Sequence, residues 1–215
     1  GYLAQRLTGK SWYELIQTRI YDRLGLRDSI IVPEFALLHR ASVGHFLDPA
    51  TGKQTRTSFP FLPLSFSPAG ATAMLSATDL ATFALAHCRD GMGANGTRLL
   101  SAESARLMRR KTASYRTPAF ADIGLGWMLL ENGVVTHGGG GPGIISVIYA
   151  HPASETVVSV LTNSAHGGVI GSEIAAPVLE AAAGAKPFGA AAAELAKRAT
   201  DQPVDPAPYV GTYEN

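Results

Sequence analysis

The sequence predicts an α/β protein of the α+β type, in which an antiparallel sheet is flanked by helices. Three observations lead to this prediction. Helical spacing of apolar residues and helix-capping residues mark residues 2–25 and 76–111. Residues 123–162 instead hold short β-branched runs separated by turn signals, and an alanine-rich helical pattern follows at 168–183. Runs of helices that are separated from runs of strands are typical of α+β domains.

The composition is that of a globular domain, and it excludes several classes of function. Of the 215 residues, 46% are hydrophobic and 16% charged, and the net charge of +1 argues against sustained attraction to nucleic acid or anionic membranes. Arg109, Arg110 and Lys111 are better explained as cations on the last turn of a helix than as a nucleic-acid site. No run reaches the roughly 18 apolar residues of a membrane span. The single cysteine, Cys88, excludes an internal disulfide, and its apolar surroundings predict a buried, inert thiol.

Capping residues predict where the helices of the first half begin. Ser11 and Glu14 form a capping box, in which each side chain satisfies a free backbone amide at the start of a helix, and Gly25 predicts its end. Ser76 and Ser101 predict the starts of two more helices. Between these helices, residues 28–69 contain five prolines and are predicted to be mostly irregular, which in a compact domain is typical of a functional surface.

The second half predicts a meander of about four antiparallel strands. The predicted strands cover residues 123–130, 134–137, 144–150 and 156–162, with Asn132-Gly133 as a strong hairpin signal between the first two. The helix at 168–183 is predicted to pack on the sheet through Ile174, Val178 and Leu179.

The sequence divides into one main domain, residues 1–185, a linker at 186–208 that is rich in alanine and then proline, and the first strand of a C-terminal β-domain at 209–215. The chain opens within a helical pattern without an initiator methionine and ends within a strand pattern. We therefore expect it to be a portion of a longer protein.

One stretch, "VVTHGGGGPGIIS" at residues 134–146, places a histidine beside four consecutive glycines. Gly138, Gly140 and Gly143 match the dinucleotide-binding fingerprint, but a strand follows where that fingerprint requires a helix. A second interpretation is the His-Gly-Gly-Gly oxyanion loop of α/β-hydrolases, although the chain has no G-x-S-x-G elbow and no parallel βαβ rhythm. A third is an edge strand whose bare backbone pairs with an ester or amide ligand and whose N–H stabilises an oxyanion. In that case His137 would orient or polarise the substrate, or help a proton move.

Four segments, in order, resemble the serine β-lactamase and penicillin-binding-protein superfamily, and specifically its class C-like esterase and D-aminopeptidase branch. They are "LAQRLTGKSWYELIQTRIYDRLGLRDS" at 3–29, "SPAGATAMLSATDLATFALAHCRDG" at 67–91, "GLGW" at 124–127 and "HGGGGPGIISVIYAHP…VVSVLTN" at 137–163. The resemblance implies a DD-peptidase/β-lactamase-like fold that is incomplete because its N-terminal part is missing. It further implies a bacterial enzyme and slightly favours a periplasmic or secreted location over the alternative, a cytoplasmic one.

The resemblance also implies the site residues. The family's Lys-Thr-Gly motif, often His-x-Gly in the esterase-like branch, maps onto His137, Gly138 and Gly139, and one oxyanion-hole amide would belong to Gly140. His137 would then be catalytic, the glycines would bind the substrate and the oxyanion, and no metal or cofactor is expected. No histidine in the chain has metal-ligand spacing.

The implied reaction is hydrolysis of an ester or amide through an acyl-enzyme, by a carboxylesterase, a D-amino-acid peptidase or a β-lactamase. The nucleophile of the family lies in Ser-x-x-Lys, and no lysine here has a serine three residues before it. Tyr-x-Asn would fall upstream of Gly1, and Tyr213-Glu214-Asn215 is expected to belong to the C-terminal strand instead. The chain alone is therefore expected to be inactive.

Two kinds of partner follow from the resemblance. One is a small-molecule ester, amide or peptide substrate, and the other is the N-terminal part of the same enzyme. An alternative function is that of a catalytically inactive relative that binds peptidoglycan or peptides.

Overall fold

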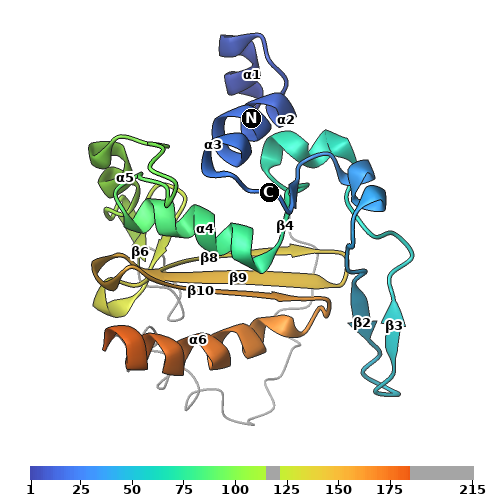
Figure 1. Ribbon diagram of the computed structural model, residues 1–215. Coiled ribbons are helices and arrows are strands. Elements are labelled where there is room, and N and C mark those ends of the chain that lie inside the picture. The colour runs from blue at the N-terminus through green and yellow to red at the C-terminus, as the bar shows by residue number, and fades with distance from the viewer. Residues whose placement is uncertain (115–121, 185–215) are drawn as a thin grey trace, which may run out of the picture.

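The chain forms a layered structure with a central antiparallel sheet between helices (Figure 1). This computed structural model describes residues 1–114 and 122–184, so the predicted linker and C-terminal strand lie outside the described residues. Helix α4 (Ala77–Cys88) covers one face of the sheet and helix α6 (Gly167–Ala183) the other, while the N-terminal helices stand beyond α4 (Figure 1). The predicted fold class, an antiparallel sheet flanked by helices, is confirmed.

The sheet has six strands in the order β10-β9-β8-β7-β6-β5, and each neighbouring pair is antiparallel. The strands are β5 (Ala113–Ser114), β6 (Asp122–Ile123), β7 (Met128–Leu129), β8 (Val135–Gly141), β9 (Ile144–His151) and β10 (Thr156–Thr162). Because the glycine-rich strand β8 continues antiparallel into β9, the α/β-hydrolase interpretation, which requires a parallel sheet, is wrong.

The described sheet differs from the predicted meander in two ways. The single strand predicted at 123–130 is divided into β6 and β7, because the chain turns between them through Gly126, whose φ of 79° is left-handed. Strand β8 continues to Gly141 instead of ending at His137. The hairpin at Asn132-Gly133 is confirmed: both residues have positive φ, in a short 3-10 turn, η4 (Glu131–Gly133), between β7 and β8.

The helices of the first half begin where their capping residues predict. Ser11 and Glu14 form the capping box at α2 (Trp12–Ile16), and the helical segment continues through η1 (Gln17–Tyr21) and α3 (Asp22–Leu24) to left-handed Gly25. Ser76 caps α4, and Ser101 caps α5 (Ala102–Met108). Helix α1 (Tyr2–Thr8) precedes these elements.

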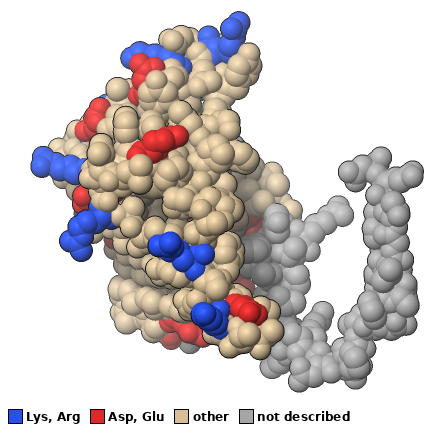
Figure 2. Space-filling model, turned by 90° about the vertical axis from the view of Figure 1, so that its right-hand side faces the viewer, with Lys and Arg blue, Asp and Glu red and all other residues tan. Residues whose placement is uncertain are grey.

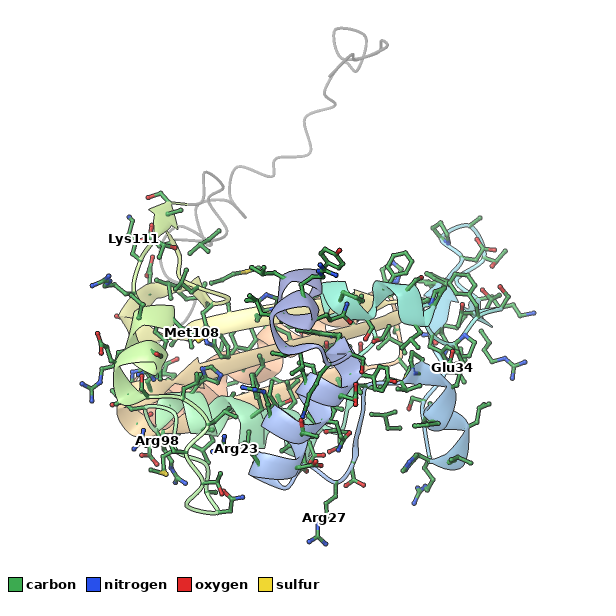
Figure 3. The ribbon with its side chains drawn as sticks, turned by 90° about the horizontal axis from the view of Figure 1, so that it is seen from above. Arg23, Arg27, Glu34, Arg98, Met108 and Lys111 are labelled. Atoms are coloured by element: carbon green, nitrogen blue, oxygen red, sulfur yellow. The ribbon has the colours of Figure 1, made fainter. Side chains whose placement is uncertain are left out.

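A hydrogen bond from the Arg23 side chain to the backbone of Arg98 joins the N-terminal helices to the loop that follows α4. Arg23 lies on α3 and Arg98 in the loop between α4 and α5, and the two side chains lie close together in Figure 3. Arg23 Nη2 donates to Arg98 O at 2.7 Å. Arg27, by contrast, points away from the body of the molecule (Figure 3).

The segment 28–69, which the sequence predicts to be irregular, contains several short elements. Strand β1 (Ser29–Ile30) pairs with β4 (Met74–Leu75), and β2 (His45–Leu47) pairs with β3 (Gln54–Arg56) to form a hairpin. Two 3-10 helices, η2 (Pro33–Leu38) and η3 (Leu64–Ala69), lie on either side of that hairpin in the chain. A further 3-10 turn, η5 (Pro152–Ser154), joins β9 to β10.

Helix α6 packs on the sheet through small residues. Gly167, Gly171, Ala175 and Leu179 are its buried positions. A Cβ atom on Gly171 would overlap Val147 on β9, so the absence of a side chain lets the helix approach the sheet closely. Leu179 faces the sheet as predicted. The predicted contacts of Ile174 and Val178 are wrong, because the small-residue face is the one in contact and these two side chains are 44% and 43% exposed.

The core on the α4 side includes Trp127 and Cys88, the latter as predicted. Burial raises the pKa of the Cys88 thiol to about 11, which fits the predicted inert thiol. Arg109 lies at the end of its own helix, as the C-cap residue of α5, and its guanidinium also donates to the carbonyl oxygens of His87 and Cys88 at the end of α4. Within the described residues no helix has the length and apolar character needed to cross a membrane.

Candidate active site

The glycine-rich half of β8 has one unpaired edge. Strand β8 pairs with β9 along its whole length, from Val135 opposite Ala150 to Gly141 opposite Ile144. On its other side β7 reaches only Val135 and Thr136. Among residues 1–114 and 122–184, nothing else pairs with this side, and residues 137–141 are exposed. The predicted edge strand is therefore present, although it is only the second half of β8.

The direction of the backbone groups along this edge follows from the hairpin with β7. The Leu130 N–H donates to Val134 O at 2.8 Å, so the backbone groups of Val134 face β7. Successive residues of a strand direct these groups to alternate sides. The N–H and C=O groups of Gly138 and Gly140 therefore face the free edge, whereas those of His137, Gly139 and Gly141 face β9. The edge offers the N–H and C=O groups of both glycines to an extended ligand, and one of them, Gly138 O, also accepts a hydrogen bond from His137 Nδ1.

The four glycines serve to remove side chains and not to allow unusual backbone angles. None of Gly138–Gly141 has the left-handed conformation that Gly143 adopts in the following turn. A Cβ on Gly139 would lie 3.0 Å from Ser146 Oγ, and one on Gly140 would lie 3.3 Å from Ile145 Cδ1. Glycine in a strand costs roughly 0.5–1 kcal/mol relative to alanine, so four cost about 2–4 kcal/mol. In return, Gly138–Gly141 form a strip of exposed backbone, here called the glycine strip, that a ligand can approach closely.

His137 stands at the start of this strip on the α4 face of the sheet. It is two residues from Val135, which belongs to the core on that face, and its own side chain is exposed. Its Nδ1 lies 2.8 Å from Gly138 O. Since a carbonyl oxygen only accepts, Nδ1 carries the proton and Nε2 carries the lone pair in the neutral ring. This hydrogen bond fixes the tautomer that His137 presents near the edge.

Ser146, which the sequence does not single out as functional, lies on β9 opposite Gly139. Its Oγ donates to Gly139 O at 3.3 Å. The hydroxyl lies close to the place where a side chain at position 139 would be. Ser146 therefore contacts the glycine strip from the β9 side.

The turn at the end of β8 is fixed by the segment that leads into β2. A Cβ on Gly44 would overlap Pro142 O, so only glycine permits this approach. The His45 N–H lies 3.0 Å from both Gly143 O and Asn163 O, and the Ala165 N–H donates back to His45 O. The contacts of His45 are thus structural. Sequence reasoning missed the contact itself, because His45 and Asn163 are 118 residues apart.

Two other histidines, His87 and His151, have their own partners away from the glycine strip. His87 is only 4% exposed, because its ring packs against Phe83 and Trp127. Burial, with a smaller contribution from the Arg109 cation, lowers the pKa of His87 to about 4. His151 Nδ1 lies 2.7 Å from Ser154 Oγ. Within the described part of the chain, no three His, Cys, Asp or Glu side chains lie together as metal ligands would.

The surface beside the hairpin of β2 and β3 carries scattered charges of both signs. Figure 2 shows the lysine, arginine, aspartate and glutamate side chains of this face separated by uncharged surface, with no single patch of one sign. The arrangement suits an uncharged or weakly charged ligand better than a polyanion. Tyr213, Glu214 and Asn215 lie outside the described residues.

Comparison with known sequences places this site in context. The family model described as Beta-lactamase matches residues 1–183. A curated relative, Penicillin-binding protein 4 of Amycolatopsis lactamdurans, is 33% identical over 100% of this chain and 56% of the relative. The chain thus spans about half the length of the curated relative that it matches.

Solved structures show the same fold. The octameric penicillin-binding protein homologue from Pyrococcus abyssi has a TM-score of 0.72 at 23% identity, covering 87% of this chain and 41% of the homologue. A D-stereospecific amidohydrolase from Streptomyces sp. has a TM-score of 0.63 at 24% identity, covering 86% of this chain and 52% of that protein. A class C beta lactamase from Rhodobacter sphaeroides has a TM-score of 0.52 at 19% identity, covering 76% of this chain and 52% of that enzyme.

Proposed function

The chain belongs to the Beta-lactamase family of serine hydrolases, and we propose that it forms the C-terminal portion of a catalytic domain that hydrolyses an ester or amide through an acyl-enzyme. The observation that carries this proposal is the free edge of β8, where Gly138 and Gly140 present bare backbone donors and acceptors. A substrate carbonyl and its neighbouring amide can pair with such an edge as an added strand does.

The proposed reaction has two steps. A serine hydroxyl supplied by the part of the enzyme outside this chain adds to the substrate carbonyl and, on loss of its proton and departure of the alcohol or amine, forms an ester with the acyl group. Water then adds to that ester and releases the acid and the serine. The negative charge that develops on the carbonyl oxygen in each step is met by the Gly140 N–H.

His137 has a supporting role in this proposal. Its Nδ1 is held by Gly138 O, so its Nε2 lone pair can accept a proton or a hydrogen bond from the substrate or nucleophile. Where the family often has lysine, this chain has His137 and therefore lacks the lysine ammonium that would hold a carboxylate. This difference favours esters or peptides over β-lactams as substrates. The similarity to a D-stereospecific amidohydrolase and a penicillin-binding protein supports the same substrate class.

A second candidate function is peptide binding without catalysis, since the free edge of β8 would hold an extended peptide with or without a nucleophile. The two candidates differ in the rest of the protein: Ser-x-x-Lys and Tyr-x-Asn motifs would support the enzyme, and the loss of either would support the binding protein.

The full-length gene product, treated with a fluorophosphonate, tests the proposal. We expect covalent labelling of one serine outside this chain and turnover of at least one member of a panel of carboxylic esters, D-amino-acid amides and β-lactams. The chain of residues 1–215, prepared free of full-length protein, should not hydrolyse p-nitrophenyl acetate or nitrocefin. Absence of labelling together with tight peptide binding would favour the binding protein, and turnover by residues 1–215 would contradict the proposed source of the nucleophile.

A further inference from the structure

Three arginine side chains converge on Asp90, at the end of the molecule where α5 lies (Figure 1). Arg106 donates to Asp90 Oδ2 through Nε at 2.9 Å and through Nη2 at 2.7 Å. Arg109 Nη2 donates to Asp90 Oδ1 at 2.5 Å, and Arg98 Nη1 donates to Asp90 O at 3.2 Å. One carboxylate therefore faces three guanidinium cations, and positive charge is in excess here.

Other carboxylates do not balance this excess. Within the described part of the chain, Arg106 and Arg109 form ion pairs with Asp90 alone, and Arg98 forms none. Glu131, in the turn η4, is exposed and makes no ion pair with them. Hydrogen bonds from Arg106 hold the pKa of Asp90 below its ordinary value, so this carboxyl is already ionised and has no further charge to contribute.

The backbone holds Asp90 in a fixed position between the arginines. Its φ of 50° is left-handed, and Gly91, which follows, is also left-handed with a φ of 84°. This conformation costs a residue with a side chain roughly 1–2 kcal/mol. A Cβ on Gly91 would overlap Leu100 O, so the turn packs closely against the following loop. The guanidinium groups that bind the Asp90 carboxylate are thereby preorganised.

A cavity of about 460 Å3 lies beside Arg106 and Arg109. The rest of its lining is glycine and apolar side chains from the hairpin of β7 and β8 and from the turn η5, and it includes Leu129, Leu130 and Pro152. This volume is in the range of small-molecule sites. The cavity combines two cations with a hydrocarbon surface, and we call it the Arg106–Arg109 pocket.

Both arginines retain hydrogen-bond donors for a ligand. A guanidinium has five N–H groups. Arg106 uses two of them on Asp90, and its Nη1 has no partner among the described residues. Arg109 donates to His87 O, Cys88 O and Asp90, which leaves its Nε without a partner in the same part of the chain. The Arg109 side chain is only 12% exposed and is held in place, whereas that of Arg106 is 67% exposed and can adjust to a ligand.

The pocket selects for one kind of ligand. Its two cations and Asp90 leave one positive charge uncompensated, which matches a single negative charge. Guanidinium groups bind carboxylates through paired, charge-assisted hydrogen bonds. The apolar lining is covered favourably only by hydrocarbon. Inorganic phosphate would bring a charge of up to two and leave that lining in contact with water.

We propose that the Arg106–Arg109 pocket binds a carboxylate ion that carries a hydrocarbon chain. The carboxylate would accept hydrogen bonds from Arg106 and Arg109, and the chain would lie against Leu129, Leu130 and Pro152. No covalent step is involved. The proposal is independent of the proposed function, because neither the pocket nor its test involves the hydrolytic reaction.

The pocket lies apart from the glycine strip. Val135, at the start of β8, belongs to its lining. Gly140 lies five residues further along the same strand, which at the rise of a β-strand is roughly 17 Å. A ligand in the pocket would therefore leave the free edge of β8 open.

Isothermal titration calorimetry of the full-length protein with decanoate, below its micelle-forming concentration, tests the proposal. We expect saturable binding at millimolar decanoate or below. Decanol has the chain without the charge, and inorganic phosphate has charge without the chain, so each should bind at least about 10-fold more weakly. No saturable binding of decanoate would overturn the proposal. Equal affinity for decanol or for phosphate would also overturn it, because the site would then recognise only one of the two features.

An arginine substitution tests whether the charge acts from within the pocket. Arg106→Gln should weaken decanoate binding at least about 10-fold, because it removes a charged hydrogen-bond donor. Arg110→Gln removes the same charge from an exposed neighbour outside the lining, and it should leave the affinity unchanged. Thermal unfolding of both variants without ligand checks that they are folded. Equal losses of affinity would show that overall charge is responsible and would contradict the pocket.

A second pair of variants places a carboxylate in or beside the pocket. Pro152→Glu would put a negative charge in the lining, where it competes with decanoate for the arginines, and binding should be lost. Ala153→Glu adds the same charge at an exposed position outside the lining, and binding should persist. If Arg106→Gln and Pro152→Glu both bind decanoate as the unsubstituted protein does, the ligand lies elsewhere, such as at the glycine strip, and the proposal is wrong.

Discussion

Gly140 is the residue on which the proposed chemistry depends most directly. Its N–H faces the free edge of β8 and makes no bond to β9, so it can be removed without breaking the sheet. The role of this N–H in the reaction can therefore be tested separately from its role in the fold.

In the full-length enzyme, Gly140→Pro should lower kcat by about 100- to 1,000-fold, the usual cost of losing one oxyanion-hole donor. Gly140→Ala keeps the N–H, and its Cβ would lie 3.3 Å from the flexible end of Ile145 and at an ordinary contact distance of 3.5 Å from Ile144 O, so kcat should change little. Steady-state kinetics of both variants provide the measurement. Similar losses in the two variants would indicate that space, and not the donor, matters at this position.

His87 links the stability of the chain to pH. Burial lowers the pKa of this histidine to about 4 in the folded chain, whereas an unfolded histidine has a pKa of about 6.5. The unfolded state therefore binds more protons between these values. The stability that this difference provides is fully present above about pH 6.5 and is lost as the pH falls toward 4.

Urea unfolding of residues 1–215 should show this dependence as a fall of about 3 kcal/mol in the free energy of unfolding that is specific to His87. His87→Phe should remove that part of the slope between pH 7 and pH 4. His39→Gln, at an exposed position, should keep the slope of the unsubstituted chain. If the His87→Phe and unsubstituted chains lose stability in parallel, the buried imidazole is not the cause.

At the scale of the element, α6 shows how small residues set the position of a helix. Gly171 lies against Val147 so closely that even a methyl group would overlap it. Gly168, about one turn earlier, has room for a methyl group, since its Cβ would make an ordinary van der Waals contact of 3.8 Å with Ile145 Cγ2. The same substitution at the two positions should therefore have opposite effects.

Gly171→Ala should destabilise residues 1–215 by about 1–3 kcal/mol through overpacking. Gly168→Ala should be neutral or stabilise the chain by up to about 1 kcal/mol, because alanine favours the helix. Thermal unfolding of the two variants compares them directly. Adding Val147→Ala to Gly171→Ala should recover part of the loss, and a lack of recovery would argue against this contact as the cause.

Local signals in the sequence predicted the starts and ends of elements well. Ser11, Ser76 and Ser101 each cap a helix within their own first turn, so the information lies within a few residues. The face of α6 could not be found in this way. Hydrophobicity favours Ile174 and Val178 as the buried side chains, and only the three-dimensional contact of Gly171 with Val147 reverses that choice.

The candidate site also has features that local sequence predicts and features that depend on long-range contacts. The composition of residues 137–140 indicated an edge strand with bare backbone as one of several interpretations. Which glycines face outward depends on the pairing of Leu130 with Val134, and the anchoring of the turn depends on Gly44 and His45, far away in the sequence. Long-range contacts of this kind leave no periodic pattern that a single sequence could reveal.

At the scale of the whole molecule, the hairpin of β2 and β3 is attached to the main sheet at its base, within the part of the chain that the structure describes. Its base, at Gly44 and His45, contacts the turn at the end of the glycine strip, and its tip, near Lys53, is exposed. A change at the base should therefore reach the candidate site, and a change at the tip should not.

In the full-length enzyme, Gly44→Ala should lower kcat/KM by at least about 10-fold, because its methyl group would displace Pro142 and with it the end of β8. Lys53→Ala, at the tip of the same hairpin, is the matched control and should keep the activity of the unsubstituted enzyme. Circular dichroism of both variants separates a local shift from unfolding. An active Gly44→Ala enzyme would show that the turn can move without consequence for the reaction.

This attachment also makes the hairpin of β2 and β3 suitable for engineering. Its exposed tip, from Ala50 to Lys53, can accept inserted residues, a fluorophore or an affinity tag without altering the base that holds the glycine strip. The same geometry would allow natural variation in hairpin length to add new contacts for a substrate while the backbone edge stays in place. The fold thus offers one region where sequence can diversify at little cost to the chemistry beside it.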